Sequence, residues 1–319
     1  MTNPDTIQLI GKHDSILLPR ICLGTGSVRT KESGGLTPLF DRFFEEHSFI
    51  DTARIYGNLL QLDKGGAEAE IGSYLKRRGL TDRVIVSTKG GHPPIYHMKG
   101  DRLNREALEK DIDLSLKYLQ RDRIDLYFLH RDNGGDLYET MRILDGFVKA
   151  GKTRFLGASN WTVDRILAAN RIAEENGFEK FVISQLRFSL AEHTKRAMSD
   201  STSVYMDDTE EDEYRRTRIP VMAAASLARG FFSKYPDVAG SSAGAYLSEV
   251  NEARAKRVAE LAARKGVSKS AVAGRYLMDL DVETVLLFSA SRKAQLDETL
   301  QVDTFRLSPE ELRYLKNGG

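Results

Sequence analysis

The chain has 319 residues, 41% of them hydrophobic, and its 47 Lys and Arg against 46 Asp and Glu give a formal net charge of +1. A charge so near zero provides no overall attraction to nucleic acid or to an anionic membrane, so any anion site must be local. The length would allow two domains, but α/β barrels commonly use this length as one, and we expect a single domain over residues 1–319.

The cysteine content and the N-terminal pattern bear on the cellular location. The single cysteine, Cys22, cannot form an internal disulfide, which agrees with a reducing compartment. The sequence has no long apolar run, and its N-terminus lacks a basic region followed by an apolar segment. We therefore expect a cytoplasmic protein with neither a membrane span nor a signal peptide. The sequence leaves the oligomeric state open.

Two short apolar segments at the N-terminus, residues 7–10 and 15–18, predict a β-hairpin because the turn-forming quartet 11–14 separates them. Such a hairpin could close one end of a larger structure. From residue 20 onward, short apolar strands alternate with segments whose apolar residues recur at helical spacing. The expected strands are residues 20–24, 49–51, 84–87, 124–129, 153–157, 181–184, 221–224 and 285–288. The expected helices are residues 39–44, 67–78, 105–119, 137–150, 163–176, 207–218, 251–265, 270–280 and 292–300.

Eight alternating strand and helix units with buried strands predict an α/β fold, a (β/α)8 TIM barrel with an N-terminal β-hairpin. A doubly wound open sheet is the alternative. Against it, Gly24-Thr25-Gly26-Ser27 after the first strand supplies only two of the glycines of a dinucleotide-binding turn and leads into a loop. In a barrel, the residues that follow the strands meet at one mouth. The polar residues at these positions are Asp51, Tyr56, Lys89, His130, Ser159, Asn160 and Gln185.

Five separated segments resemble the successive signatures of the aldo-keto reductase superfamily, in the right order and over essentially the whole chain. They are F-I-D-T-A-R-I-Y-G, V-S-T-K-G, D-L-Y-F-L-H, V-K-A-G-K-T-R-F-L-G-A-S-N and S-L-A-R-G. The resemblance implies a barrel that binds a nicotinamide cofactor, usually NADPH, and reduces aldehydes or ketones without a metal. By position, it implies a catalytic tetrad of Asp51, Tyr56, Lys89 and His130.

The side chains of this tetrad suit carbonyl reduction on chemical grounds. Hydride addition to a carbonyl builds an alkoxide, so the enzyme must stabilise a negative oxygen and deliver a proton. A free phenol has a pKa near ~10, and a neighbouring ammonium favours its phenolate form. We expect Tyr56 to donate the proton, Lys89 to supply the ammonium, and Asp51 to hold Lys89. His130 can orient the carbonyl oxygen through a ring N–H.

The resemblance also assigns a cofactor site. Hydroxyl and carboxamide groups of Ser159, Asn160 and Gln185 would hold the nicotinamide carboxamide. Ser226, Leu227, Arg229 and Gly230 look like the family's pyrophosphate loop, with backbone N–H groups and one guanidinium facing phosphate. Arg292, with Ser291 and the N-terminus of the closing helix, is the group we expect at a 2′-phosphate, and Lys293 is a weaker candidate. This favours NADP over NAD.

One residue departs from the family pattern. The family commonly places Tyr or Trp at the end of the seventh strand to stack on the nicotinamide, and this chain has Ala224 there. Phe188 or Trp161 could fill the space.

The sequence does not define the substrate beyond a small carbonyl compound. Loops at residues 58–66, 91–103 and 231–247 should rim the pocket. The Gly, Ser and Ala content of residues 233–248 suits either a mobile flap or a disordered segment.

Two other functions compete with reduction. A nucleotide-binding module of the same fold could sense redox state or dock on a partner, which the intact tetrad argues against and Ala224 favours. A metal-dependent barrel hydrolase is disfavoured because only His130 ends a strand and His92 and His97 lie in a loop with no metal-ligand spacing.

Overall fold

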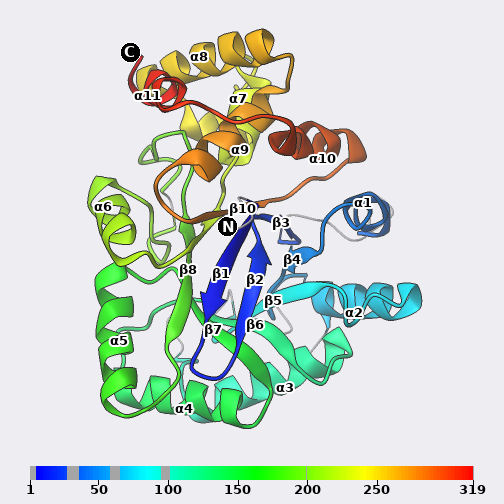
Figure 1. Ribbon diagram of the computed structural model, residues 1–319, viewed down its shortest axis with the longest axis vertical. Coiled ribbons are helices and arrows are strands. Elements are labelled where there is room, and N and C mark those ends of the chain that lie inside the picture. The colour runs from blue at the N-terminus through cyan, green and yellow to red at the C-terminus, as the bar shows by residue number, and fades with distance from the viewer. Residues whose placement is uncertain (1–4, 27–35, 58–64, 95–100, 199, 319) are drawn as a thin grey trace.

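Eight parallel strands close into a barrel in the order β10-β3-β4-β5-β6-β7-β8-β9 in the computed structural model, which describes residues 5–26, 36–57, 65–94, 101–198 and 200–318 (Figure 1). The strands are β3 Ile21–Gly24, β4 Phe49–Asp51, β5 Ile85–Gly90, β6 Ile124–Leu129, β7 Thr153–Ser159, β8 Phe181–Arg187, β9 Val221–Ala224 and β10 Thr284–Phe288. The closed parallel sheet confirms the predicted (β/α)8 barrel, and the open doubly wound sheet is wrong.

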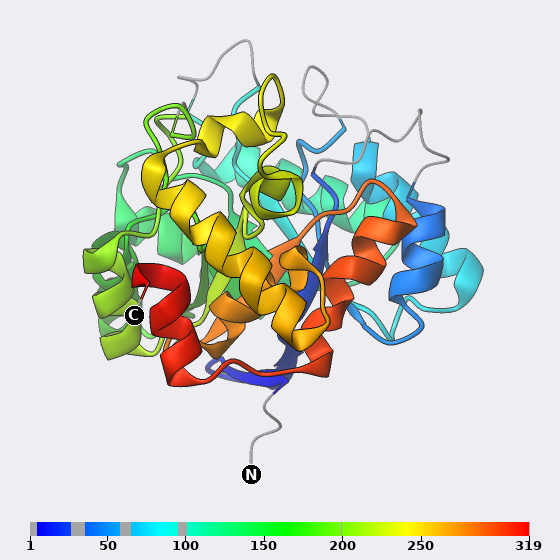
Figure 2. The same ribbon diagram turned by 90° about the horizontal axis from the view of Figure 1, so that it is seen from above.

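Helices surround the barrel (Figure 1), and Figure 2 shows the barrel from the side, with the dark-blue N-terminal hairpin at its lower end. The predicted helices are all present, with ends that differ by at most two residues: α1 Thr37–Phe43, α2 Gly66–Arg78, α3 Arg105–Leu119, α4 Leu137–Lys149, α5 Val163–Glu175, α6 Asp208–Thr217, α8 Glu249–Lys265, α9 Lys269–Asp279 and α10 Lys293–Leu300. The sequence analysis missed the short helices η2 Ala228–Gly230, α7 Phe231–Lys234, η3 Ser242–Tyr246 and η4 Gln301–Thr304, and the terminal helix α11 Pro309–Asn317. Helix α11 had a readable signal, because Ser308 and Glu311 form a capping box before it.

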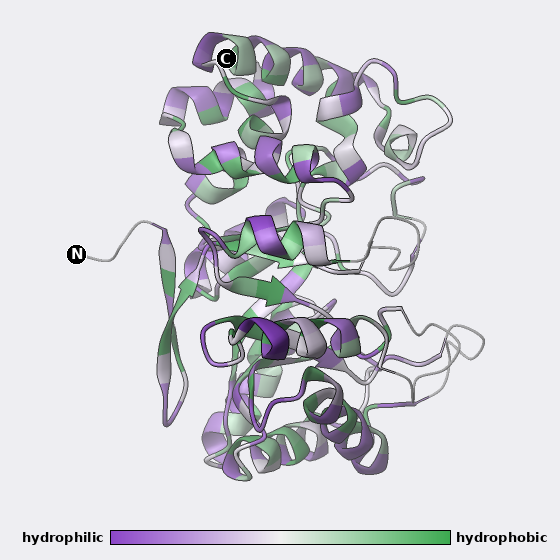
Figure 3. Ribbon diagram, turned by 90° about the vertical axis from the view of Figure 1, so that its right-hand side faces the viewer, coloured by the Kyte–Doolittle hydropathy of each residue, from purple (hydrophilic) through white to green (hydrophobic). Residues whose placement is uncertain are grey.

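The predicted N-terminal hairpin is confirmed, and it closes one end of the barrel (Figures 1 and 3). Its strands, β1 Thr6–Ile10 and β2 Ser15–Pro19, pair antiparallel. Ile7, Leu9 and Leu18 are buried in the same apolar cluster as the residues that fill the barrel interior. The hairpin therefore works as an apolar plug, which leaves polar chemistry to the opposite end.

Strand alternation decides which side chains face the barrel interior. Phe128, Phe155, Ile183 and Met222 belong to the inner cluster, whereas Tyr127, Leu156 and Ala223, which are next to three of them, belong to the cluster between the strands and the helices. Continuing this alternation toward the carboxyl ends of the strands places a layer of mostly polar side chains inward at the mouth. That layer consists of Asp51, Ser87, Lys89, His130, Ser159, Gln185, Arg187 and Ala224.

Three strands run further toward the mouth than the sequence analysis predicted. Strand β5 continues to Gly90, β7 to Ser159 and β8 to Arg187. The predicted ends were too early because inward polar residues were interpreted as loop, although parallel pairing continues through Ser159 with Gln185 and through Arg187 with Ala224. The site residues on these strands are thus fixed by the barrel's hydrogen-bond ladder.

The segment that follows β9 is packed against the barrel, so the disordered segment that we considered for residues 233–248 is wrong. Val238, Ala243 and Tyr246 are each at most 1% exposed. The predicted rim loops fall partly at residues 58–64 and 95–100, which lie outside the described residues. Among the helices that the structure describes, none is long and apolar enough to cross a membrane.

The hairpin yields a stability prediction. Leu18 is fully buried and Leu17, its neighbour on β2, is 57% exposed. We expect Leu18→Ala to lower the free energy of unfolding by about 2–4 kcal/mol, because it leaves a cavity under the barrel. The matched variant Leu17→Ala should change it by no more than about 0.5 kcal/mol. Urea denaturation followed by circular dichroism measures both, and equal effects of the two variants would contradict the role of the hairpin as a plug.

Candidate active site

A buried ion pair lies at the centre of the polar layer. The Nζ of Lys89 is 2.6 Å from Oδ2 of Asp51 and donates a second hydrogen bond of 2.8 Å to the carbonyl oxygen of Thr52. The other carboxylate oxygen, Oδ1, accepts from Ser87 Oγ at 2.7 Å and from Gln185 Nε2 at 3.2 Å. Burial opposes the charge on Lys89, but Asp51 and the neighbouring Tyr56 outweigh it and raise the pKa of the ammonium.

The loop after β4 brings Tyr56 to this ammonium. Its backbone continues the pairing with β5, because the amide of Arg54 donates to the carbonyl of Lys89 at 2.9 Å. The Nζ of Lys89 lies 5.0 Å from the centroid of the Tyr56 ring. Gly26 lies against the phenol, and a Cβ added there would come within 3.0 Å of Cζ, so a larger residue at this position would displace Tyr56. The loop geometry therefore places a phenol directly beside a fixed positive charge.

A second buried ion pair lies beneath the same loop. The guanidinium of Arg54 pairs with the carboxylate of Glu68 on α2, and both side chains are at most 2% exposed. Glu68 also accepts from Thr88 Oγ1 at 2.7 Å. These contacts join the Tyr56 loop to α2 and to β5, so they hold the loop that carries the phenol in place.

His130 follows β6 and completes the group of four. Its amide donates to the carbonyl of Gly90 at 2.9 Å, and its ring meets the Tyr56 ring edge to face with centroids 5.8 Å apart. Burial, together with the positive charges of Lys89 and Arg131, holds the pKa of His130 well below its usual range. His130 is therefore a neutral imidazole at physiological pH. The structure brings all four predicted residues together. The His92 ring also packs against His130, with ring centroids 4.8 Å apart.

Ser159, Asn160 and Gln185 form one polar cluster next to the ion pair. Asn160 adopts a φ of 57°, a left-handed conformation that Asn tolerates better than most residues, and its amide donates to the carbonyl of Gln185 at 2.9 Å. Its side chain donates to Ser159 Oγ at 3.2 Å and to the carbonyl of His130 at 3.1 Å. These groups present hydroxyl, carbonyl and amide atoms on one surface, which suits a carboxamide ligand.

The segment after β9 has an unusual backbone. Ala225, Ala228, Arg229 and Gly230 all have a positive φ, between 47° and 80°, and three of them are not glycine. Such conformations cost free energy and are concentrated at functional sites. Ser226 anchors the segment by donating to the carbonyl of Leu287 at 2.7 Å. Turns of this kind expose backbone N–H groups in concave arrangements that bind anions.

The N-terminus of α10 holds the last predicted residues. Ser291 donates from its amide and its hydroxyl to Gln295 Oε1, at 3.0 and 2.9 Å. Arg292 occupies the N-cap position and is exposed, beside rather than within the wall that Ser291 and Gln295 form.

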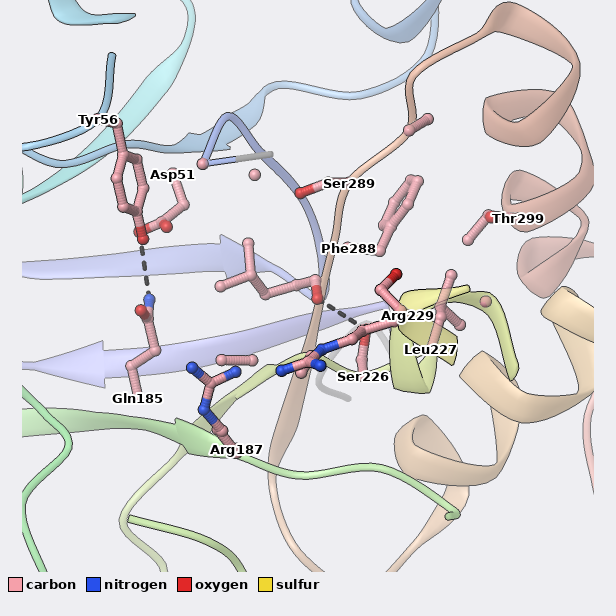
Figure 4. Close-up of a pocket in the computed structure, with 18 of the residues that line it drawn as sticks. Asp51, Tyr56, Gln185, Arg187, Ser226, Leu227, Arg229, Phe288, Ser289 and Thr299 are labelled. Atoms are coloured by element: carbon pink, nitrogen blue, oxygen red, sulfur yellow. Dashed lines mark hydrogen bonds between the residues drawn. The ribbon is translucent and has the colours of Figure 1, made fainter. Parts of the chain in front are cut away.

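A cavity of about 920 Å³ joins these groups at the barrel mouth. Its wall includes Tyr56, His130, Ser159, Asn160 and Gln185 at one end. It continues past Ser226, Leu227, Arg229 and Gly230 to Ser291, Gln295 and Thr299. Figure 4 shows Tyr56, Asp51 and Gln185 on one side of the pocket and Thr299 across from them, with Ser226 and Arg229 in between. A volume near the upper end of typical ligand pockets suits a long ligand.

Two arginines of this wall were not predicted from the sequence. Arg131 follows His130, and Arg187 lies two residues after Gln185 on the same face of β8. Alternation along a longer β8 would have indicated Arg187. Arg187 pairs in register with Ala224, so a guanidinium lies beside the position where an aromatic ring was expected. Trp161 and Phe188 are buried outside the described cavity wall, so the idea that either ring fills that position is wrong.

Fold and site together define a class: a closed eight-stranded α/β barrel with a hairpin over one end, and a Tyr, Lys, Asp and His group beside an elongated cavity at the other. The chain belongs to the aldo/keto reductase family, whose model matches residues 20–317. Among the described residues, no three His, Cys, Asp or Glu side chains converge as a metal site would require.

The chain is similar to proteins named as reductases and to one named as a dehydrogenase. It is 41% identical over 151 residues to 6-dehydroglucose reductase of Novosphingobium aromaticivorans, a match that covers 46% of this chain and 48% of the relative. The chain thus spans about half the length of that relative, and 52% of an aryl-alcohol dehydrogenase of Pestalotiopsis microspora that is 29% identical. Versiconal hemiacetal acetate reductase of Aspergillus parasiticus is 28% identical, with 85% of this chain and 84% of the relative covered.

Solved structures share the fold. An aldo-keto reductase from Klebsiella pneumoniae in complex with NADPH superposes with a TM-score of 0.68 at 23% identity, covering 94% of this chain and 90% of the other. A thermostable aldo-keto reductase in complex with epalrestat superposes with a TM-score of 0.71 at 21% identity, covering 98% of this chain and 99% of the other.

His92 provides a pH prediction. Burial and the charge of Arg131 lower the pKa of His92 to about 4, from 6.5 in the unfolded chain. As pH falls, the unfolded chain therefore binds a proton first, and the stability due to the neutral imidazole is lost between pH 6.5 and 4. We expect the unfolding free energy of the wild type to fall more steeply over this range than that of His92→Asn.

Urea denaturation at a series of pH values measures this slope. The exposed His13→Asn is the matched control and should behave as the wild type. Equal slopes for the wild type and His92→Asn would show that His92 does not resist protonation.

Proposed function

We propose that the protein is an NADP(H)-dependent oxidoreductase that reduces an aldehyde or ketone to an alcohol. One observation carries the proposal: the Lys89 ammonium, fixed by Asp51, lies 5.0 Å from the Tyr56 ring in a cavity that His130 also lines. This arrangement offers a proton donor, a charge that stabilises its conjugate base, and a neutral hydrogen-bonding imidazole at one place.

The residues of the cavity fit a nicotinamide dinucleotide. Ser159, Asn160 and Gln185 offer the donors and acceptors that a carboxamide needs. The positive-φ segment with Arg229 and Gly230 suits a pyrophosphate, and the start of α10 with Ser291 and Arg292 suits a further phosphate. Family members solved with NADPH or NADP support this choice of cofactor. When bound, the reduced nicotinamide supplies the hydride.

The chain's own residues perform the remaining work. His130 donates a ring N–H to the carbonyl oxygen and orients it, and Tyr56 transfers its hydroxyl proton to that oxygen as negative charge develops there. The phenolate left on Tyr56 is stabilised by the ammonium of Lys89. Asp51 keeps Lys89 charged and in position, while Ser87 and Gln185 keep the carboxylate of Asp51 hydrogen-bonded. Asp51, Lys89 and His130 are buried, which reduces the screening of these interactions by water.

A second candidate is a nucleotide-binding module that senses redox state without efficient catalysis. The observation that favours it is Ala224, a methyl group facing the cavity where a stacking ring would hold a nicotinamide. Turnover decides between the candidates, because a sensor would bind NADPH and leave aldehydes unreduced.

Replacing the phenol tests the mechanism. We expect Tyr56→Phe to lower kcat/KM for NADPH-dependent reduction of aromatic and aliphatic aldehydes by roughly 10²- to 10⁴-fold, the usual contribution of a positioned proton donor. NADPH oxidation is followed by the absorbance of the reduced nicotinamide at ~340 nm. NADPH affinity is measured by fluorescence, and the Kd of the variant should stay within about twofold of the wild-type value. The exposed Tyr138→Phe is the control. An unchanged rate in Tyr56→Phe would remove Tyr56 from the reaction.

The 2′-phosphate assignment has its own test. We expect Arg292→Ala to raise the Kd for NADPH about 10-fold and to leave that for NADH unchanged, because only NADPH carries the phosphate that a guanidinium binds. The exposed Arg313→Ala on α11 removes the same charge elsewhere and should affect neither cofactor. Equal weakening of both cofactors by Arg292→Ala would refute the assignment.

A further inference from the structure

Arg187 is held rigidly at the mouth of the barrel. It follows Ile183 and Gln185 on the inward face of β8 and lines the same cavity as Tyr56 and His130. Its amide donates to the carbonyl of Val204 at 3.0 Å, and its own carbonyl accepts from the amide of Met206 at 2.8 Å. Figure 4 shows the Arg187 side chain projecting from the end of β8 toward the pocket.

The acidic neighbour of Arg187 is already committed to other donors. Asp200 accepts from both terminal nitrogens of Arg131, at 3.3 and 3.1 Å, and from Thr202 and Ser203. Arg187 reaches the same carboxylate only at 4.0 Å. The Nε atoms of Arg131 and Arg187 are buried and find no hydrogen-bond partner among the described residues. The carboxylate of Asp200 therefore pairs with two guanidiniums, and its interaction with Arg187 is the weaker of the two.

The rest of this end of the cavity does not balance the positive charge. In the described wall, the acidic side chains are Asp51 and Glu298. Asp51 is paired with Lys89. Glu298 belongs to α10 and neighbours Thr299, which Figure 4 places across the pocket from Gln185. Burial and nearby cations lower the pKa of His92 and of His130, so neither imidazole changes the sum. A net positive charge thus remains beside the tetrad.

We propose that Arg187, supported by Arg131, binds an anionic group on the carbonyl substrate, so that the enzyme prefers aldehydes or ketones that carry a carboxylate. The planar guanidinium of Arg187 presents paired N–H donors that match a carboxylate in a bidentate fork. This inference rests on the proposed reduction and assigns its substrate class. The same chemistry would also suit the pyrophosphate of the dinucleotide, and the experiment separates these two sources.

The test compares two aldehydes that differ in charge. The anionic substrate is 4-formylbenzoate and the neutral one is its methyl ester, which keeps the ring and the reacting group. We expect the wild type to have the higher kcat/KM for the acid. Arg187→Gln should lower kcat/KM for the acid by about 10- to 100-fold, as expected for a lost hydrogen bond to a charged group, and change that for the ester by less than about twofold. Arg187→Lys should retain part of the preference because it keeps the charge.

Two further measurements complete the design. Arg142→Gln, which removes an exposed charge on α4, is the matched control and should leave the preference intact. Calorimetric titration of 4-formylbenzoate into the protein saturated with NADP⁺ reports binding of the acid without turnover, and fluorescence titration reports NADPH affinity of each variant.

The outcomes separate this inference from the proposed function. Reduction of the ester without preference for the acid, or equal losses for both substrates in Arg187→Gln, overturns the anion site and leaves the reductase standing. A loss confined to NADPH affinity assigns Arg187 to the pyrophosphate and also overturns it. If neither aldehyde is reduced, the proposed function fails, and calorimetry alone tests the anion site. The site is supported if the wild type binds the acid and Arg187→Gln does not. It is overturned if the wild type does not bind the acid or if both proteins bind it equally.

Discussion

The buried pair of Lys89 and Asp51 is the interaction on which the rest of the site depends. Removing two charges from water costs several kcal/mol per ion, and the pair is tolerated only if nearby groups satisfy its remaining hydrogen bonds. Ser87, Gln185 and the Thr52 carbonyl do so, and they come from different strands or strand ends. The barrel must therefore hold several strands in register for the charge beside Tyr56 to exist.

The fold meets this requirement by separating its two ends. Below the polar layer, Phe128, Phe155 and Met222 fill the interior, and the hairpin covers them with further apolar side chains. Above it, strands β4 to β8 each contribute inward polar residues at or just after their carboxyl ends. The low polarity beneath and the fixed dipoles above make electrostatic effects at the mouth large, which is also why His92 and His130 remain uncharged there.

Much of this was predictable from the sequence, for identifiable reasons. Asn104 accepts from the amide of Ala107 and caps α3, as an asparagine before a helix is expected to do, and the alternation of apolar strands and helices indicates the closed barrel. The tetrad could be located because Asp51, Lys89 and His130 lie at the ends of apolar strands and because the segments that carry all four residues resemble the family's signatures. The ends of strands could not be located where the last residues are polar and point inward, because a polar residue facing the cavity and one in a loop have the same local pattern. For this reason Arg187 was not predicted as a site residue.

Contacts between distant segments were also beyond the sequence. Nothing in the spacing of Arg131, Arg187 and Asp200 indicates that one carboxylate serves two guanidiniums, since this depends on the bridge that draws residues 204–206 to the end of β8. Likewise, the pairing of Arg187 with Ala224 appears only when β8 and β9 are placed side by side.

The hairpin has a consequence for ligand access. Because Leu9 and Leu18 close the hairpin end of the barrel, ligands enter and leave through the mouth. Gln185 lies two positions deeper on β8 than Arg187, so a molecule seated on the glutamine sits underneath one seated on the arginine. Depth along β8 thus separates the two positions: Gln185 is nearer the closed end of the barrel, and Arg187 is nearer its opening.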